Sequence, residues 1–479
     1  MQEFINTHNP VLPVSVHVPD CEAHVMSDGK LYLYGSYDDR EDAYCSEQYH
    51  VVSTPDMEHW TIHDVSLEGR DISWFGDSDA PRWPEAAQGR ITPFIRKTYI
   101  RGMRDKLLRR LLHPGRRSTA AAASDAQETA QTDGGTPMTL ETENPPLLYA
   151  PDCICREGRY YLYFCMSDDS EGVAVSDRPE GPFAHPVQLP CSGIDPAVFV
   201  DEDGQAYYYW GQFAANGVKL NEDMCSFGRE DIVNDLVTEE KHCFHEGSSM
   251  RRIGDTYYYV FADMQRGKPT SLGYATGPSP LGPFTYRGIL VDNAACDPES
   301  WNNHGSIEQF QGQWYVFYHR SSRGGRFHRR LCIEPITIAS DGSIAEVPMT
   351  SQGAGKPFAP GEVIMGYQAC GLKGAVYIGT EETDAGESLQ NIANRDEACF
   401  RYIESPAPYC RAEVVFRGTG IIELLMDGTL VGKLSCMNAE DHAYHPVSCG
   451  ITCPPGRYTL TLRFRRPRGL RMKSVTLFC

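Results

Sequence analysis

The sequence lacks several features that would assign it to common protein classes. No run of its 479 residues approaches the roughly 18 consecutive apolar residues that a membrane-spanning helix needs. The first ten residues, MQEFINTHNP, have no basic start followed by an apolar run, so we recognise no secretory signal peptide. The 17 cysteines include no Cys-x-x-Cys pair, which argues against the common zinc and dithiol redox motifs. The sequence therefore predicts no transmembrane segment.

Positive charge is also scarce. Lys and Arg number 44 against 64 Asp and Glu, which gives a formal net charge of −20 and a pI near 5.2. This balance argues against nucleic acid or an anionic membrane as the main partner and favours a neutral or cationic ligand. The cysteines are odd in number, and several, such as Cys165 and Cys332, lie in apolar strand contexts. They are typical of reduced thiols that act as small core hydrophobes, so we expect a cytoplasmic protein.

Helical periodicity is nearly absent, and short strand signals dominate. Five runs share one pattern, in which a tyrosine-rich strand follows a glycine: DGKLYLYGS (28–36), EGRYYLYFC (157–165), DGQAYYYWG (203–211), GDTYYYVFA (254–262) and QGQWYVFYH (311–319). The last four of these glycines follow one another at intervals of 46, 50 and 58 residues, which suits a four-stranded propeller blade. The sequence therefore predicts an all-β fold that contains a five-bladed β-propeller.

A polar residue capable of acid–base or metal chemistry lies six to nine positions before each repeated glycine. These residues are Asp20, Asp152, Asp195, Glu246 and His304. The first strand of every propeller blade lines the central channel, so equivalent positions of successive blades converge. Hydrolysis of a glycosidic bond needs one carboxylic acid to protonate the leaving oxygen and one carboxylate to activate water or attack carbon. We therefore expect the four carboxylates and the histidine to face one pocket with this chemistry.

The rest of the chain divides into an insertion, a linker and a second domain. The propeller pattern covers residues 1–345 and is interrupted near residues 75–145. Within this insertion, residues 90–117 carry ten Lys or Arg against one Asp, and residues 119–137 have low complexity. We interpret the insertion as a loop that docks on the acidic body. A helix that binds a membrane surface or a partner, or that supports a homo-oligomer, is the alternative.

The C-terminal part is predicted to be an accessory domain. We interpret residues 346–365 as a linker and residues 366–479, with their alternating strands, as a β-sandwich. All six tryptophans lie between residues 60 and 314, so this domain lacks the best platform for sugar stacking. Tyr402, Tyr409 and Tyr444 are possible substitutes, and we expect weak sugar binding or none. Within the propeller, Trp210 and Trp301 are candidates for the wall of a sugar site.

The five segments, in order, resemble the successive blades of glycoside hydrolase family 43. They are VPDCEAHVMSDGKLYLYGS (18–36), LLYAPDCICREGRYYLYF (147–164), GIDPAVFVDEDGQAYYYWG (193–211), HEGSSMRRIGDTYYYVFAD (245–263) and NHGSIEQFQGQWYVFYH (303–319). The resemblance covers roughly residues 8–345 without the insertion. It implies a five-bladed propeller that hydrolyses arabinofuranosides and xylosides with inversion. The C-terminal domain resembles, more faintly, carbohydrate-binding module family 6.

The resemblance also implies catalytic roles for particular residues. By position it implies a general base at Asp20, a modulator of pKa at Asp195 and a general acid at Glu246. It implies at His304 a channel histidine that in the family often binds calcium or its waters. Tyr149 stands where the family usually has tryptophan and keeps an aromatic wall beside the substrate.

Two further residues receive an interpretation at this stage. The family's arginine near the modulator falls at Arg329 or Arg330, and the sequence does not distinguish between them. Asp152 is interpreted as a structural residue that fixes the start of its blade through backbone hydrogen bonds.

We expect an exo-acting α-L-arabinofuranosidase or β-D-xylosidase that removes single sugars from plant-type oligosaccharides. A related specificity, such as galactofuranosidase, is an alternative. A catalytically silent glycan-binding propeller and a scaffold that recruits a partner through its basic insertion are rivals from other classes. The combination of Asp20, Asp195 and Glu246 favours the enzyme, because binding alone needs no acid–base set.

Overall fold

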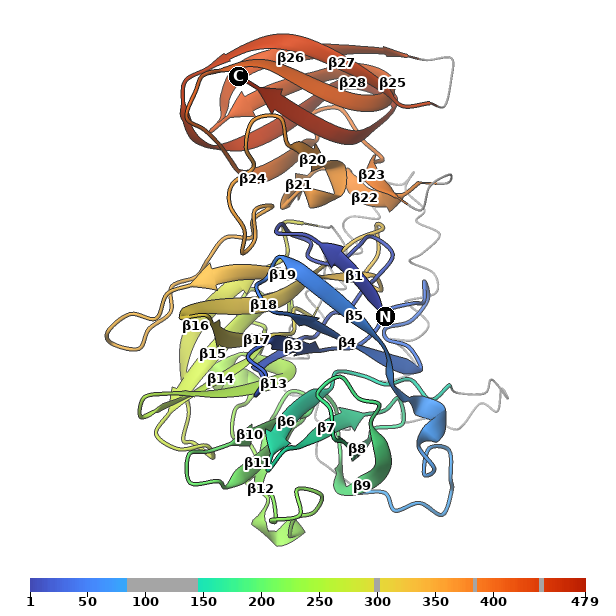
Figure 1. Cartoon of the computed structure of the whole chain (residues 1–479), viewed down its shortest axis with the longest axis vertical. Coiled ribbons are helices and arrows are strands. Elements are labelled where there is room, and N and C mark those ends of the chain that lie inside the picture. The colour runs from blue at the N-terminus through green and yellow to red at the C-terminus, as the bar shows by residue number, and fades with distance from the viewer. Residues whose placement is uncertain (84–144, 297–301, 382–385, 439–442) are drawn as a thin grey trace.

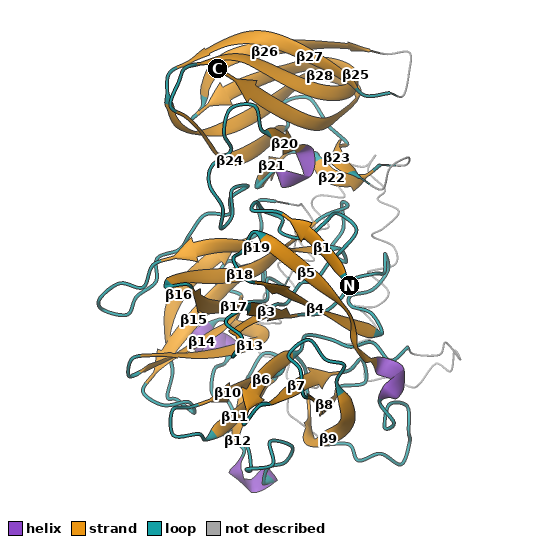
Figure 2. Ribbon diagram, in the orientation of Figure 1, coloured by secondary structure: helices purple, strands orange, loops and turns teal. Residues whose placement is uncertain are grey.

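The computed structural model describes residues 1–83, 145–296, 302–381, 386–438 and 443–479. Figure 1 shows two β domains, a propeller coloured from blue to gold and a C-terminal domain in orange and red. Helix is confined to single turns in the described residues (Figure 2). Among these residues, no helix combines the length and apolar character that crossing a membrane requires. Most of the predicted insertion, residues 84–144, lies outside the described part of the chain.

The propeller has five blades, which confirms the fold prediction. Each blade is an antiparallel sheet whose strands follow one another in chain order. Blade I comprises β2 (Glu22–Val25), β3 (Leu31–Tyr34), β4 (Gln48–Thr54) and β5 (His59–Glu68), with β1 (Gln2–Ile5) at its outer edge; blade II comprises β6 (Asp152–Arg156), β7 (Arg159–Cys165), β8 (Ser170–Ser176) and β9 (Ala184–Ser192); blade III comprises β10 (Ala197–Val200), β11 (Ala206–Trp210) and β12 (Asn216–Lys219); blade IV comprises β13 (Phe244–Ile253), β14 (Thr256–Asp263), β15 (Ser271–Gly277) and β16 (Thr285–Asp292); blade V comprises β17 (Ser306–Phe310), β18 (Gln313–Ser321) and β19 (Arg329–Ile336). The short helical turns are η1 (Gly69–Asp71), η2 (Arg229–Asp231) and α3 (Glu239–His242).

The repeated glycine lies in the hairpin turn that joins the first two strands of each blade. Gly29, Gly158, Gly204, Gly254 and Gly312 all have a φ between 61° and 82°. Residues with a Cβ atom are strained in this left-handed region, which explains the recurrence of glycine. The tyrosine-rich run that follows is therefore the second strand of each blade, and the polar residue upstream lies just before or within the first.

The first strands of the five blades contact one another in a closed ring around the channel. Ser306 of β17 joins blade V to blade I, since its hydroxyl donates to the Cys21 carbonyl (2.9 Å) and accepts from the Ala23 amide (3.1 Å). The N-terminal segment completes the closure, because the Asn9 side chain exchanges hydrogen bonds of 3.1 and 2.9 Å with the backbone of Ile333 in β19. The two ends of the propeller sequence are thus held together, and the channel strands are fixed in place.

The C-terminal domain is a nine-stranded antiparallel sheet that curves into two layers, consistent with the predicted β-sandwich. Its elements are β20 (Val363–Met365), η3 (Gly366–Gln368), β21 (Gly371–Lys373), β22 (Tyr377–Thr380), β23 (Glu387–Gln390), β24 (Glu397–Ser405), β25 (Tyr409–Met426), β26 (Thr429–Asn438), β27 (His445–Cys453) and β28 (Gly456–Phe478). The two longest strands, β25 and β28, pair along most of their length. They therefore link the layers into one barrel-like sheet.

Residues 346–365, which we expected to be a linker, are packed between the two domains. Met349, Phe358 and Ile364 are buried, and Phe358 forms a β-bridge with Ile403. These side chains belong to one hydrophobic core that continues from blades IV and V into the C-terminal domain. The two domains therefore share a hydrophobic core.

The tyrosines proposed as substitute sugar platforms are engaged within the C-terminal domain. The Arg457 guanidinium lies 4.0 Å from the centre of the Tyr402 ring, and the Arg417 guanidinium lies 5.6 Å from that of Tyr444. Tyr409 is 1% exposed. These contacts support weak sugar binding by this domain, which stays a prediction.

Candidate active site

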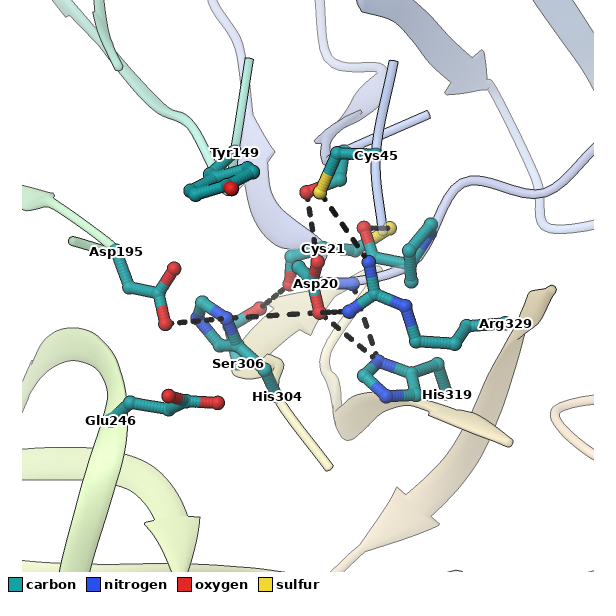
Figure 3. A network of polar contacts seen from close by, with 12 residues as sticks. Asp20, Cys21, Cys45, Tyr149, Asp195, Glu246, His304, Ser306, His319 and Arg329 are labelled. Atoms are coloured by element: carbon teal, nitrogen blue, oxygen red, sulfur yellow. Dashed lines mark hydrogen bonds and ion pairs between the residues drawn. The ribbon is translucent and has the colours of Figure 1, made fainter. Parts of the chain in front are cut away.

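Three carboxylates reach one space at the centre of the propeller (Figure 3). Asp20 and Asp195 lie two residues before the first strands of their blades, with φ values of 58° and 54°. Aspartate tolerates this left-handed conformation better than most residues. Glu246 lies within β13, where the pairing with β14 is irregular between Glu246 and Ser249. A bulge of this kind re-aims a side chain, here towards the same space.

Asp20 has the most contacts of the three carboxylates. Its Oδ1 atom lies 2.7 Å from the Arg329 guanidinium and 3.3 Å from His319 Nδ1, and its Oδ2 atom accepts a 2.8 Å hydrogen bond from Ser36. Burial acts to raise the pKa of Asp20, but the Arg329 charge and the neighbouring histidines outweigh it and hold the pKa below its usual value. Asp20 is therefore ionised at neutral pH, as a general base must be.

Asp195 and Glu246 lie in a different environment. Asp195 is buried, and burial together with the charges of Glu246 and Asp20 raises the pKa of Asp195 well above its usual value. Glu246 is also buried, and its Oε2 atom accepts a 2.7 Å hydrogen bond from the Gln212 amide and lies 3.7 Å from His245 Nε2. The pocket therefore combines one ionised carboxylate, Asp20, with a second, Asp195, whose pKa its surroundings raise.

His304 lies between these groups. Its Nδ1 atom is 3.8 Å from Asp20 and 3.7 Å from Asp195. Gly247 makes room for the ring, because a Cβ atom at that position would lie 2.7 Å from it. Burial lowers the pKa of His304, so the ring is neutral near pH 7. Its Nε2 atom is buried without a hydrogen-bond partner among the described residues, which leaves it available to water or a hydrated cation.

The two candidate arginines at the start of β19 point in opposite directions. Arg329 bonds to Asp20 and, through two contacts of 2.9 Å, to Asp38. Arg330 instead lies 2.6 Å from Glu387 of the C-terminal domain. Only Arg329 therefore belongs to the pocket.

Of the aromatic residues proposed to line the sugar site, Tyr149 and Trp210 lie in different parts of the propeller. Tyr149 lies beside Asp195 at the pocket (Figure 3). Trp210 is completely buried and stacks with Tyr208 and Phe227 at centroid distances of 5.4 and 5.8 Å. Both contacts belong to the core between the blades, so the structure corrects the expectation that Trp210 walls a sugar site. Trp301 lies outside the described residues.

Sequence reasoning did not single out Ser36, Asp38, Gln212 or His319. Ser36 and Asp38 follow β3, Gln212 follows β11, and His319 lies near the end of β18. The end of the second strand in a hairpin lies beside the start of the first, as the pairing of Glu22 with Tyr34 shows. Polar residues after the tyrosine-rich runs therefore carry the same positional signal as the upstream carboxylates.

A second polar cluster lines the channel strands beyond the pocket. Asp152 accepts hydrogen bonds of 2.7 Å each from the Cys153 and Val198 amides, as expected for a structural residue, and lies 2.7 Å from His24. Glu22 pairs with Arg251 at 3.1 Å, and burial raises the pKa of Glu22 to about 8. Three side chains of this cluster, Glu22, His24 and Asp152, could hold a metal ion together, because their ligand atoms lie within 4.8 Å of one another. No other group of three or more His, Cys, Asp or Glu side chains in the described part of the chain meets this distance.

The open atoms of this channel suit a hydrated divalent cation. Hard cations such as calcium prefer oxygen ligands and often keep waters. The Asp152 oxygens are already engaged, whereas Glu22 Oε1 and His304 Nε2 are buried without partners among the described residues. A cation on the channel axis would therefore be held by these residues largely through its water shell.

An ionised carboxylate held by arginine, a buried carboxylate with a raised pKa and a third carboxylate beside them fit the acid–base equipment of a glycoside hydrolase. A sequence profile of the glycosyl hydrolases family 43 matches residues 126–344. A β-xylosidase from Xylanibacter ruminicola is 32% identical over 42% of this chain and 74% of its own length. The chain belongs to glycosyl hydrolases family 43 and is a glycosidase.

Two further relatives extend the comparison. A protein from Thermoclostridium stercorarium named xylosidase/arabinosidase is 26% identical over 98% of both chains. The structure of a family 43 enzyme from Xanthomonas citri complexed with xylotriose is similar over 72% of this chain and 94% of that one, with a TM-score of 0.51 and 26% identity. The similarity therefore covers 72% of the chain in structure and 98% of it in sequence.

Proposed function

We propose that the protein is an inverting, exo-acting glycosidase that removes arabinofuranosyl or xylosyl units from plant-type oligosaccharides. The observation that carries the proposal is the meeting of three buried carboxylates in one pocket, Asp195, Glu246 and Asp20, of which Arg329 keeps Asp20 ionised. The names of the relatives supply the sugar class, since both xylosidases and arabinosidases are found among them.

In this mechanism Glu246 donates its proton to the glycosidic oxygen as the bond to the anomeric carbon breaks. Asp20 takes a proton from a water molecule, whose oxygen attacks the anomeric carbon from the opposite face. The products are a free sugar with inverted configuration and the shortened oligosaccharide with a new hydroxyl group. Asp195 lies beside Glu246, interacts with it electrostatically and orients it as the acid.

Turnover of nitrophenyl α-L-arabinofuranoside, β-D-xyloside and β-D-galactofuranoside at several pH values tests the proposal. Proton NMR of the first-formed sugar identifies its anomer. We expect cleavage of the first or second substrate with inversion. Retention would contradict the roles of Asp20 and water, and no cleavage of any substrate would favour a silent glycan-binding propeller.

A galactofuranosidase is a second candidate. A β-D-galactofuranosidase from Aspergillus niger is 32% identical over 40% of this chain and 60% of its own length. Preferential cleavage of the galactofuranoside in the same panel would establish this alternative.

Two further proposals concern the conditions in which the enzyme works. One solved relative, from a compost metagenome, is described as a calcium-free form, which supports calcium as the cation for the channel site near His304. None of the 17 cysteines, all of which lie in the described part of the chain, forms a disulfide bond, which supports a reducing compartment such as the cytoplasm. Thiol titration of protein purified without reductant checks the second proposal, since a low count would oppose it.

A further inference from the structure

The start of β19 connects the catalytic pocket directly to the C-terminal domain. Successive residues of a strand point to opposite faces of the sheet. Arg329 therefore faces the pocket, where it lies 2.7 Å from Asp20, while Arg330 faces the C-terminal domain, where it lies 2.6 Å from Glu387. A shift in the Arg330 backbone necessarily moves Arg329.

Glu387 holds two guanidinium groups at this boundary. Its Oε1 atom contacts Arg330 and also Arg323, at 3.3 Å, in the loop between β18 and β19. Both arginines also donate to the Val14 carbonyl, at 2.8 and 3.5 Å. Within the described part of the chain, no other carboxylate forms an ion pair with either arginine. Glu387 is 1% exposed, so solvent contributes little to balancing these charges.

The neighbouring histidines do not help Glu387 to balance the charges of Arg323 and Arg330. His17 and His328 contact each other at a centroid distance of 5.0 Å. Burial and the charges of Arg323 and Arg330 lower the pKa of both rings, to about 4 for His328, so the histidines stay neutral. The cluster without Glu387 would therefore carry two close positive charges and no negative one.

The same cluster also supports the other side of the pocket. The His17 carbonyl accepts a 2.9 Å hydrogen bond from the backbone amide of Asp38, the carboxylate that holds Arg329 by two contacts. Tyr377 of the C-terminal domain packs on the loop before β19, where a Cβ atom at Gly324 would lie 3.0 Å from its ring. The C-terminal domain thus contacts both the loop and the strand that carry Arg329.

We propose that Glu387 is a positioning residue for the active site, which acts through Arg330 and β19 to hold Arg329 on Asp20. The C-terminal domain then serves catalysis by fixing a propeller strand, without needing to bind sugar. This inference rests on the proposed role of Asp20 as the general base.

The test compares full-length wild type with Glu387→Gln, Glu387→Asp and a matched control, Glu423→Gln. Glu423 is also a buried carboxylate that contacts two cations, Arg465 at 3.0 Å and Lys433 at 3.2 Å, but all three lie in the C-terminal domain. Steady-state kinetics on the best nitrophenyl substrate are measured well below the melting temperature of each variant.

We expect kcat of Glu387→Gln to fall by about 10- to 100-fold with KM nearly unchanged, because misplacement of a catalytic group acts on the chemical step. Glu387→Asp should have an intermediate kcat, and Glu423→Gln should match wild type. In an Arg329→Lys background, Glu387→Gln should add little further loss, because both substitutions act on the same interaction. Full wild-type kcat in folded Glu387→Gln, or independent effects of the two substitutions, would overturn the inference.

Two further measurements test the inference if the variant does not fold or if the wild type shows no activity. If Glu387→Gln yields no folded protein, Glu387→Asp replaces it, and full activity of that variant refutes the inference. If wild type cleaves no substrate, the proposed function fails separately, and crystal structures of wild type and variant decide the positioning role. Loss of the 2.7 Å contact between Arg329 and Asp20 in the variant would support it, and an unchanged contact would contradict it.

Discussion

Replacing Glu246 by glutamine removes a proton donor while changing the shape of the pocket very little. Glu246 is buried, and its Oε2 atom accepts a 2.7 Å hydrogen bond from Gln212. A glutamine at this position has the same shape and can turn its carbonyl oxygen towards Gln212. The variant therefore keeps the packing and isolates the proton transfer.

The magnitude follows from the role of the acid. General acid catalysis contributes about 10²- to 10⁴-fold, which corresponds to about 2.7–5.4 kcal/mol of barrier height. That loss applies when the leaving oxygen is a sugar hydroxyl, which needs a proton to depart. A nitrophenolate leaves without one, so its cleavage should fall far less. Weakening of the hydrogen bond to Gln212 costs on the order of 1 kcal/mol and affects both substrates equally.

The assay measures kcat/KM of wild type and Glu246→Gln on a nitrophenyl glycoside and on a natural disaccharide of the same sugar. We expect the variant to lose at least about tenfold more activity on the disaccharide than on the aryl glycoside. Asp20→Asn provides the contrast, because activation of water is needed whatever the leaving group, and both substrates should suffer alike. Equal losses on both substrates in Glu246→Gln would refute the assignment of Glu246 as the acid.

Three further predictions concern stability and metal binding. Arg329→Met leaves Asp20 buried without its cation, so the free energy of unfolding in urea should fall by about 3–5 kcal/mol at neutral pH. Because the folded pKa of Asp20 lies below its unfolded value of 3.8, the stability that this ion pair contributes is present above pH 3.8 and is lost as pH falls through the folded pKa; a pH-independent deficit would contradict this. Burial raises the pKa of Glu334 to about 8 from 4.5, so wild-type stability should decrease by up to about 1.4 kcal/mol per unit as pH rises between these values, and Glu334→Gln should flatten that slope. Treatment with a chelator should lower the melting temperature and the activity, and added calcium should restore both. If neither changes, the site near His304 binds water and no cation.

The repeat in the sequence was sufficient to predict the five blades and the convergence of Asp20, Asp195, Glu246 and His304. Asp152, which was expected in the same pocket, instead lies in a separate cluster with Glu22 and His24. Hairpin turns demand glycine with positive φ, and the strands after them demand residues that pack between blades, so both leave a regular pattern in the chain. Equivalent positions of equivalent blades then face the channel by symmetry. The turn and strand pattern within each repeat is therefore sufficient to locate the pocket.

Other features were decided only by contacts between residues far apart in the chain. Arg329 and Arg330 are neighbours of the same type, and only the presence of Asp20 on one face of β19 and Glu387 on the other separates their roles. Trp210 lies at the end of β11, where the sequence predicts a sugar-stacking residue, but the packing of Phe227 against it buries the ring.

The same distinction applies to the electrostatics and to the boundary between domains. Asp20 and Asp195 occupy matching positions in their repeats, yet their pKa values shift in opposite directions. Asp20 forms a 2.7 Å ion pair with Arg329, whereas burial and the charges of Glu246 and Asp20 outweigh the Arg329 charge at Asp195. The sequence of segment 346–365 is typical of a linker, but its side chains Met349, Phe358 and Ile364 are buried, because residues from blades IV and V and from the C-terminal domain close around them. Local periodicity in the sequence is enough to predict which positions face the channel. The tertiary structure decided the charge, partner and exposure of each side chain, since those depend on neighbours that folding brings together.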